Sequence, residues 1–457
     1  MQRASTKDKV QRTKSGFLAT RDMTEIGSAI SDRVPSGQRS LLERLGEIAH
    51  HLGTRSFLVG GPVRDLLLGQ TRERQETGDR RPSSVVQLPD LDIAVEDKSH
   101  EFGAAVAKEL GGRFVYHARF LSGSVILPPA PDPRSPTPVH IDITQTRAET
   151  YATPAVLPTV RPASIVGDLG RRDFTINAMA MEITPASFGA FIDPFDGRAD
   201  MKSRQVRVLH ARSFIDDPTR IFRCIRFAVR LGFEIEPGTL APMRAAIEQR
   251  LPAFLTPERI LYELRLICAE PLAVPMVKML VRERVLEAAW RWTPPAGFMR
   301  AFARLGAVPP SSLPDSSLLF IYWLSVLPLT ERFPIRKEER DAAKAVAGFA
   351  ELKHKLRHKP MPSEVYRTLR SVPEPALQIL AVLETKAVSA NIRAFLDDYS
   401  KVRIAATGAD LRGLGLAPGP RYREILDELL FARLDGRIRA VSEERALLQK
   451  LARQRAG

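Results

Sequence analysis

Cysteine is nearly absent from this chain of 457 residues, which contains two. Cys224 and Cys268 both stand within apolar segments of helical spacing. Two such thiols exclude a disulfide framework and a cysteine-based metal cluster. This cysteine usage is typical of the reducing cytosol, so we expect a cytoplasmic protein.

Long hydrophobic runs are lacking as well. The longest is LLFIYWLSVLPL at 318–329, shorter than the roughly 20 apolar residues that a membrane-spanning helix needs. We therefore expect a buried helix at this position and no membrane partner. The start of the chain, MQRASTKDKVQRTKSG, has charges but no apolar core after them, so we expect no signal peptide.

Positive charge is what the chain has in excess. Lys and Arg together number 68 and Asp and Glu 53, a formal net charge of +15 at pH 7. Such an excess indicates a polyanionic partner, most often nucleic acid. A generally basic soluble protein is the alternative. Because 44% of the residues are hydrophobic, the chain is expected to be globular.

The pattern of apolar residues divides the chain near residue 210. Before this point strand-like and helical segments alternate, and after it the pattern is helical. The spacing predicts helices and strands at about 38–52, 99–110, 113–117, 122–127 and 139–146. The predicted fold class is α+β, with an N-terminal mixed domain and an all-α remainder.

Three polar stretches interrupt this pattern. Residues 1–36 are polar and basic, and we expect them to be disordered. Residues 71–89 form a polar stretch, and residues 128–138 are rich in proline. Both are predicted to be exposed loops.

Two aspartates stand on one face of a predicted strand in PDLDIAVED. Residues i and i+2 of a strand share a face, so Asp90 and Asp92 point the same way. In VHIDITQT, Asp142 occupies the polar face of another strand. Adjacent carboxylates repel unless a cation lies between them. If the strands are neighbours, three carboxylates converge into a site suited to Mg²⁺, although Asp-x-Asp alone is often a solvated strand edge.

A possible phosphate-binding turn follows the first strand, in FLVGGPVRD. Gly60 and Gly61 allow close backbone approach, and Pro62 suits the first turn of a helix. The free N–H groups of that helix end favour a phosphate, which Arg64 could reach. The alternative is a tight structural turn in which Arg64 pairs with Asp65.

A second charged cluster occurs in DLGRRDFTINAMA. Arg171, Arg172 and Asp173 precede an apolar segment. Guanidinium groups bind phosphate, and a carboxylate accepts from a ribose hydroxyl. Asn177 would need a partner if buried, so we interpret it as a polar fastener of the site. A capped helix start with a local ion pair is the alternative.

Four arginines follow one stripe of the helix predicted from IDDPTRIFRCIRFAVR. They are Arg220, Arg223, Arg226 and Arg230. Like charges on one stripe repel, and a polyphosphate between them reverses the sign of the interaction. Asp217 stands where it could cap the helix. A solvated basic face is the alternative.

Taken in order, these motifs resemble the class II tRNA nucleotidyltransferases, a family shared with bacterial poly(A) polymerases. The matching segments are GGPVRDLLLG, DLD, DLGRRDFTINAMA, IDPFDG, DDPTRIFRCIRF and, near the C-terminus, 407–438. The resemblance implies a polymerase-β-like nucleotidyltransferase head followed by helical neck, body and tail domains. The expected domains are a disordered extension, head, neck, body and tRNA-contacting tail at 1–36, 37–185, 186–270, 271–395 and 396–457.

The resemblance also implies residue roles. It assigns catalytic magnesium to Asp90 and Asp92 and a third acidic position to Asp142. It assigns nucleotide contacts to Gly60, Gly61, Arg64, Arg172, Asp173, Asp217, Arg220, Arg223 and Arg226. Within this set Asp217 and Arg220 would read the base edge, because a carboxylate and a guanidinium complement both C and A. Arg230 receives no role, and Asp216 stands where the family usually has Glu.

The activity implied is template-independent addition of C, C and A to the 3′ end of tRNA from CTP and ATP, with release of pyrophosphate. The segment 147–165 spans the place of the family's flexible loop and has full length, which argues against an enzyme that adds only CC. An A-adding enzyme, a poly(A) polymerase and a non-catalytic RNA-binding protein are the alternatives.

Overall fold

The computed structural model describes residues 34, 36–69, 90–128, 140–308, 317–327 and 333–455. The predictions for residues 1–33, for 71–89 and for most of 128–138 lie outside these ranges. The chain forms two compact units. The first comprises the residues up to Thr256 together with Glu270–Arg291, and the second comprises Pro257–Ala269 together with the residues from Trp292 onward. The finer division into five domains stays a prediction.

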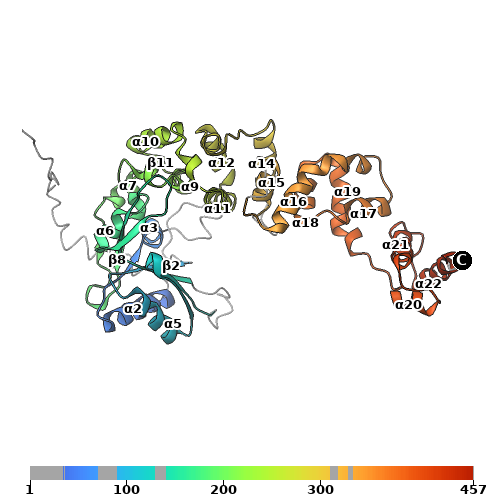
Figure 1. Ribbon diagram of the computed structural model, residues 1–457, viewed down its shortest axis with the longest axis horizontal. Coiled ribbons are helices and arrows are strands. Elements are labelled where there is room, and N and C mark those ends of the chain that lie inside the picture. Colours follow the sequence, from blue (N-terminus) through green and yellow to red (C-terminus); the bar gives the residue numbers. More distant parts are fainter. Residues whose placement is uncertain are drawn as a thin grey trace, which may run out of the picture. The chain divides into compact units, whose positions relative to one another are not determined.

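The first unit is built on a mixed sheet of seven strands in the order β3-β4-β5-β2-β1-β8-β9 (Figure 1). Most neighbours are antiparallel, and only β2 and β5 among these paired strands run parallel. The strands are β1 (Ser56–Val59), β2 (Asp90–Val95), β3 (Arg113–His117), β4 (Ser122–Ile126), β5 (His140–Gln145), β8 (Ala180–Glu182) and β9 (Phe191–Ile192).

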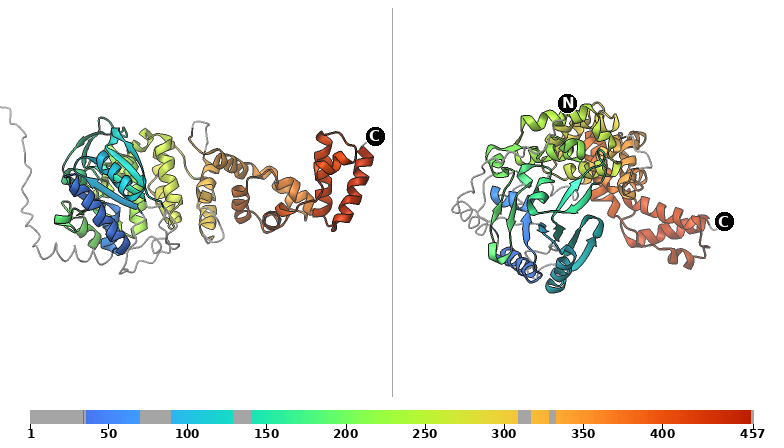
Figure 2. Two further views of the ribbon diagram at one scale, coloured as in Figure 1. Left: turned by 90° about the horizontal axis from the view of Figure 1, so that it is seen from below. Right: turned by 60° about the vertical axis from the view of Figure 1, so that its left-hand side comes forward.

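Helices α2 (Ser36–His51) and α5 (Ser99–Leu110) contact each other and the sheet, and Figure 2 shows α2, in blue, beside the strands. Between helices and sheet lie apolar side chains such as Leu45, Phe57 and Phe102, all fully buried. These helices and strands β3, β4 and β5 agree with the predicted segments, so the α+β interpretation of this part is confirmed.

A two-stranded hairpin of β6 (Arg147–Thr150) and β7 (Thr159–Pro162) follows β5. The segment 147–165, which spans the place of the family's flexible loop, contains these two strands, and the backbone pairs from Arg147 with Pro162 to Thr150 with Thr159. Ala155, at the turn, donates its amide N–H to the carbonyl oxygen of Asp216 (3.4 Å). Helix α6 (Ile165–Gly170) begins directly after the hairpin and is capped by the Ser164 hydroxyl, which accepts from the Gly167 N–H.

The arginine-rich segment forms α9 (Thr219–Leu231). Preceding it are α6, α7 (Gly197–Ser203), β10 (Gln205–Val206) and α8 (Ser213–Asp216); following it are β11 (Glu234–Ile235), α10 (Pro237–Glu248), α12 (Ala273–Arg282) and α13 (Val285–Trp290). The pairing of β10 with β11 corrects the expectation that everything after residue 210 is helical. Helix α9 contacts α8, α12, β10 and β11, so its apolar side chains are buried.

The regular elements described in the second unit are all helices. Two apolar clusters hold parts of it, one around Leu356, Leu369 and Leu377, the other around Leu411, Ile425 and Leu429. The helices are α11 (Pro257–Cys268), α14 (Phe298–Gly306), α15 (Ser317–Val326), α16 (Lys337–Gly348), α17 (Pro362–Leu369), α18 (Glu374–Leu383), α19 (Lys386–Asp397), α20 (Gly408–Gly413), α21 (Pro420–Leu434) and α22 (Val441–Arg455).

The part of the apolar run that the structure describes, 318–327, lies as predicted mostly in a buried helix, α15, in which Phe320 and Trp323 are almost fully enclosed. Within the described parts of the chain no helix combines the length and the apolar character needed to cross a membrane. The two cysteines are free thiols, and each is buried in a different unit, Cys224 in α9 and Cys268 in α11.

Candidate active site

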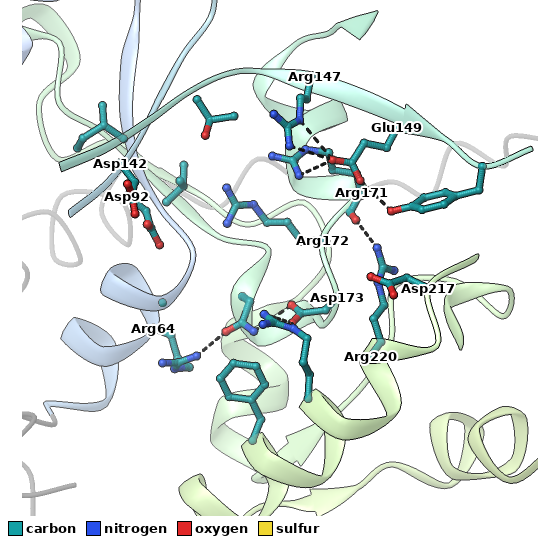
Figure 3. A pocket seen from close by; sticks show the side chains of 18 of the residues that line it. Arg64, Asp92, Asp142, Arg147, Glu149, Arg171, Arg172, Asp173, Asp217 and Arg220 are labelled. Atoms are coloured by element: carbon teal, nitrogen blue, oxygen red, sulfur yellow. Dashed lines mark hydrogen bonds and ion pairs between the residues drawn. The ribbon is translucent and has the colours of Figure 1, made fainter. Parts of the chain in front are cut away.

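A cavity of about 530 Å³ in the first unit is lined by residues of β2, β5, β6 and α9 and by residues 171–177 before β8 (Figure 3). Its walls are strongly charged. Carboxylates come from the sheet, from β6, from the segment 171–173 and from Asp217. Guanidinium groups come from α3 (Gly61–Leu68), β6, the segment 171–173 and α9. Most of the residues singled out in the sequence lie on this one cavity.

The acidic wall comes from the two parallel strands. Asp92 and Asp142 are register partners on β2 and β5, and Figure 3 shows them side by side. The Ser124 hydroxyl on β4 donates to Asp142 Oδ1 at 2.5 Å. Asp90 lies on β2 opposite His140, two residues before Asp92 and hence on the same face; its side chain lies outside the described residues.

Two neighbouring carboxylates on one sheet face suit a hard divalent cation, which prefers oxygen ligands. Among the side chains that the structure describes, no group of three His, Cys, Asp or Glu residues comes together as a metal site. The described pair therefore fits a cation as part of a site, and the assignments of Asp90, Asp92 and Asp142 stay predictions.

The glycine turn brings backbone and a guanidinium close together. Gly60 has φ 74°, a conformation that favours glycine, and donates its N–H to the Met179 carbonyl at 3.0 Å. A Cβ at Gly60 would stand 2.5 Å from Arg172 Nη1. Gly61 lines the cavity. Gly60 is not among the lining residues that the structure describes, and its lack of a Cβ makes room for Arg172. Figure 3 shows the Arg172 side chain extending toward Asp92.

Arg64 lies on the cavity wall and is 3% exposed. Its Nε donates to Asp65 Oδ1 at 2.8 Å and its Nη1 to Asn177 Oδ1 at 2.5 Å. The pairing with Asp65 that the sequence left as the alternative is thus present, and Asn177 is the polar fastener that was predicted. Because these bonds orient the guanidinium at the cavity, they are compatible with the predicted phosphate contact as well.

The arginine pair after α6 is held by a fully buried acid. Asp168 accepts from Arg171 Nε at 2.8 Å and from Arg172 Nη2 at 3.1 Å. Burial alone would raise the pKa of Asp168, but the two guanidinium groups hold that pKa below its usual range. Asp168 therefore stays ionised and orients both arginines.

Asp173 is bound on both oxygens. Oδ1 accepts from the Phe174 N–H at 2.9 Å and from Asn177 Nδ2 at 3.0 Å, while Oδ2 accepts from Arg223 Nε at 2.8 Å. Burial opposes ionisation, yet the Arg223 charge and the Asn177 amide lower the pKa of Asp173 to about 2. The ribose contact predicted for Asp173 stays a prediction, since in this structure the carboxylate joins its own segment to α9.

Helix α9 presents three of its four arginines to the cavity. Arg220, Arg223 and Arg230 line it, with Asp217 at the helix start. Arg226 is 8% exposed and stands outside the described lining, so its predicted nucleotide contact finds no direct support in this geometry. Arg230, which received no role, lies on the wall and pairs with Glu270 at 3.6 Å.

Asp217 and Arg220 lie side by side (Figure 3). The Asp217 carboxylate accepts from the Thr219 N–H at 3.0 Å and hydroxyl at 2.6 Å, so it caps α9 as the sequence suggested. Arg220 donates to the Ser213 hydroxyl and to the Arg171 carbonyl, both at 2.7 Å. These bonds fix a carboxylate and a guanidinium next to one another at the cavity.

The sequence interpretation missed three cavity residues on β6 and directly after it: Arg147, Glu149 and Tyr151. Glu149 accepts from Arg147, from Arg171 Nη1 at 2.9 Å and from the Tyr151 hydroxyl at 2.9 Å. Burial, followed by the charge of Glu149, raises the pKa of Tyr151, which therefore stays a donor. The signal was the alternation in RAETY, which places these side chains on one strand face.

Comparison with known proteins points to the same family as the sequence motifs. Residues 56–207 match the model of the poly A polymerase head domain. An A-adding tRNA nucleotidyltransferase of Halalkalibacterium halodurans is 32% identical over 84% of this chain and 86% of its own length. One of Geobacter sulfurreducens is 30% identical over 94% of this chain, which spans 48% of that relative.

Among solved structures, a CCA-adding enzyme in its apo form II superposes with a TM-score of 0.72 and 26% identity, over 94% of this chain and 98% of that one. The Thermotoga maritima CCA-adding enzyme complexed with tRNA has a TM-score of 0.68 and 25% identity, over 94% and 98% of the two chains. The resemblance seen in the motifs and the predicted head with a helical remainder are thereby confirmed. The chain belongs to the class II tRNA nucleotidyltransferase family.

Proposed function

We propose that this nucleotidyltransferase adds the terminal adenosine to the 3′ end of tRNA, using ATP. The observation that carries the proposal is a cavity that brings together Asp92, Asp142, the arginine wall and the Asp217–Arg220 pair. Two A-adding relatives, which match 84% and 94% of this chain, favour adenosine as the nucleotide that is added.

The 3′-hydroxyl oxygen of tRNA would bond to the α-phosphorus of ATP as the bond to the pyrophosphate oxygen breaks. Divalent-metal use is expected of this family; we propose Mg²⁺, held by Asp92 and Asp142 together with Asp90. When bound, it lowers the pKa of the attacking hydroxyl and offsets charge on the phosphate. Arg64, Arg172 and Arg223 would bind the triphosphate, since guanidinium groups match phosphate oxygens.

Selection of the base would rest on Asp217 and Arg220. Adenine and cytosine each present an exocyclic amino donor beside a ring-nitrogen acceptor, which complement a carboxylate and a guanidinium. Guanine and uracil present the reverse order, so both protein groups would lose a partner. Leaving a buried polar group unsatisfied costs about 1–3 kcal/mol, enough for selection.

Addition of all three nucleotides, the activity predicted from the sequence, is the second candidate. The superposition on a CCA-adding enzyme over 94% of the chain favours it, and the Asp217–Arg220 pair suits CTP as well as ATP. The net charge of +15 supports tRNA as the acceptor in either case.

The deciding experiment offers purified enzyme three tRNAs that end before CCA, after the first C and after the second C. Each is incubated with Mg²⁺ and ATP, CTP or both, and the products are separated at single-nucleotide resolution. One AMP added only to the tRNA ending in CC supports the A-adding proposal. Completion of the shortest tRNA with both nucleotides supports CCA addition. Long adenosine tails would instead indicate a poly(A) polymerase, and no extension of any tRNA would refute the proposal.

A further inference from the structure

One phenylalanine ring on the cavity wall is surrounded by arginines. The Cζ atoms of Arg64, Arg223 and Arg226 lie 5.1, 5.5 and 5.6 Å from the centroid of Phe227. The ring is 6% exposed, and its edge-to-face contact with buried Phe174 has a centroid distance of 5.9 Å. A guanidinium within about 6 Å of an aromatic face is attracted by the ring's quadrupole.

These contacts are part of a closed chain of interactions, here called the circuit, that includes the ring. Arg64 Nη1 donates to Asn177, Asn177 donates to Asp173, and Asp173 accepts from Arg223. Phe227 then joins Arg223 back to Arg64. The circuit links α3, the segment 173–177 and α9, so the two guanidinium groups are held together although they come from distant parts of the sequence.

Three like charges around one ring repel each other. Asp65 pairs with Arg64 and Asp173 pairs with Arg223, which reduces this repulsion. The aromatic face offsets part of the remaining repulsion without occupying the hydrogen-bond donors. An aliphatic side chain of similar size would fill the space but would provide no quadrupole.

We propose that Phe227 is a positioning residue that holds Arg64 and Arg223 in place for the polyphosphate of the incoming nucleotide. This inference rests on the proposed function, since it takes ATP as the ligand. The inference also gives a role to Arg226, which is not among the lining residues described but adds a third cation to the same ring.

The ring's position separates this role from base stacking. A base needs an open aromatic face, and Phe227 is 6% exposed with three guanidinium groups around it. The ring should therefore affect recognition of the phosphates and leave recognition of the adenosine moiety unchanged.

The experiment compares Phe227→Leu, Phe227→Tyr and a matched control, Phe222→Leu, which removes a fully buried ring of the same helix that lies outside the described cavity lining. Binding of ATP, tripolyphosphate and adenosine is measured by calorimetry in one Mg²⁺ buffer. For Phe227→Leu we expect about tenfold weaker binding of ATP and tripolyphosphate and unchanged adenosine binding. Phe227→Tyr, which keeps the ring, should stay within about twofold of the unmodified enzyme.

Steady-state AMP addition provides a second readout: Phe227→Leu should raise KM for ATP and leave kcat nearly unchanged. Thermal unfolding is recorded for every variant, and Phe222→Leu should lose stability without losing tripolyphosphate affinity. Unchanged tripolyphosphate binding by folded Phe227→Leu, or an equal loss for adenosine, would overturn the inference. If the unmodified enzyme binds ATP but extends no tRNA, the proposed function fails while the binding comparison still stands.

Discussion

Asp92 and Asp142 occupy paired positions on the parallel strands β2 and β5, so carboxylates from two separate segments face one cavity. Parallel pairing fixes this relationship through the backbone, because the register that places Ile93 opposite Ile143 in the core also places the two acids together.

Asp142→Asn should lower AMP addition roughly 100-fold or more, because an amide lacks the charge that holds a divalent cation. Ser124→Ala is the matched control, since it removes only the hydroxyl that donates to Asp142; a loss of a few-fold is expected. Both are assayed by single-turnover extension, with tRNA binding measured in parallel. EDTA should stop the unmodified enzyme and added Mg²⁺ restore it. Full activity of Asp142→Asn would refute the metal assignment.

Arg220→Ala should reduce the preference for ATP over GTP and UTP by about 10- to 100-fold, because the ring nitrogen of adenine loses the guanidinium that donates to it. Arg223→Ala should instead weaken all nucleotides alike, since Arg223 anchors Asp173. Competition between nucleotides on one tRNA measures both effects. The control is Arg212→Ala, an exposed arginine that pairs with Asp216 and should change neither. Equal selectivity in Arg220→Ala would exclude Arg220 from base reading.

Asp173 should make stability depend on pH in an acidic window. Its pKa is about 2 in the folded protein, against 3.8 for an ordinary aspartate. A lowered pKa contributes stability that is complete above about pH 4 and is lost as the pH falls through 2. Nearly two units correspond to about 2 kcal/mol. Urea unfolding of the unmodified protein and Asp173→Asn should therefore show a free-energy difference that narrows between pH 5 and 2.5; a constant difference would contradict the assignment.

Gly60→Ala should impair nucleotide binding more than its backbone strain explains. At φ 74° and ψ −125° Gly60 has a conformation outside the αL region, which costs a residue with a Cβ about 1–3 kcal/mol, and here the Cβ would also displace Arg172. Gly111→Ala is the control, because Gly111 has φ 70° with open space around its Cβ position. Gly60→Ala should lose more stability than Gly111→Ala in urea unfolding, because ψ is −125° at Gly60 and 28° at Gly111, and only Gly60→Ala should raise KM for ATP. Equal KM values would show that Arg172 tolerates the displacement.

Glu149→Gln should loosen the hairpin that begins with β6. It removes the charge between Arg147 and Arg171, and breaking a buried ion pair costs about 3–5 kcal/mol. We expect a lower unfolding temperature and faster proteolysis within 151–158. Glu101→Gln, at an exposed position of α5, is the control and should change neither. A protease-resistant hairpin in Glu149→Gln would show that the backbone pairing suffices.

The sequence predicted which face of each strand or helix is polar better than it predicted which elements lie next to one another. The alternation around Asp92 and Asp142 placed each acid on a polar strand face, but the parallel pairing of β2 with β5 depends on contacts distant in sequence. Helical spacing put the four arginines of α9 on one stripe, and their separate roles came only from the family resemblance, in which Arg226 had a nucleotide contact and Arg230 had none. In the structure Arg230 lies on the cavity wall, whereas Arg226 is 8% exposed and is not among the lining residues described. Arg147 and Glu149 were missed because the segment 147–165 was only compared with the family's flexible loop and its alternation was not considered.

The two cysteines provide a native probe of local opening. Each is buried in a different compact unit, and burial raises the pKa of both thiols, so they are protonated and enclosed at neutral pH. A thiol in this state reacts with an alkylating reagent only after its surroundings open. The labelling rates of Cys224 and Cys268, read by mass spectrometry, should therefore report the opening free energies of the catalytic and helical units separately, without any engineered label.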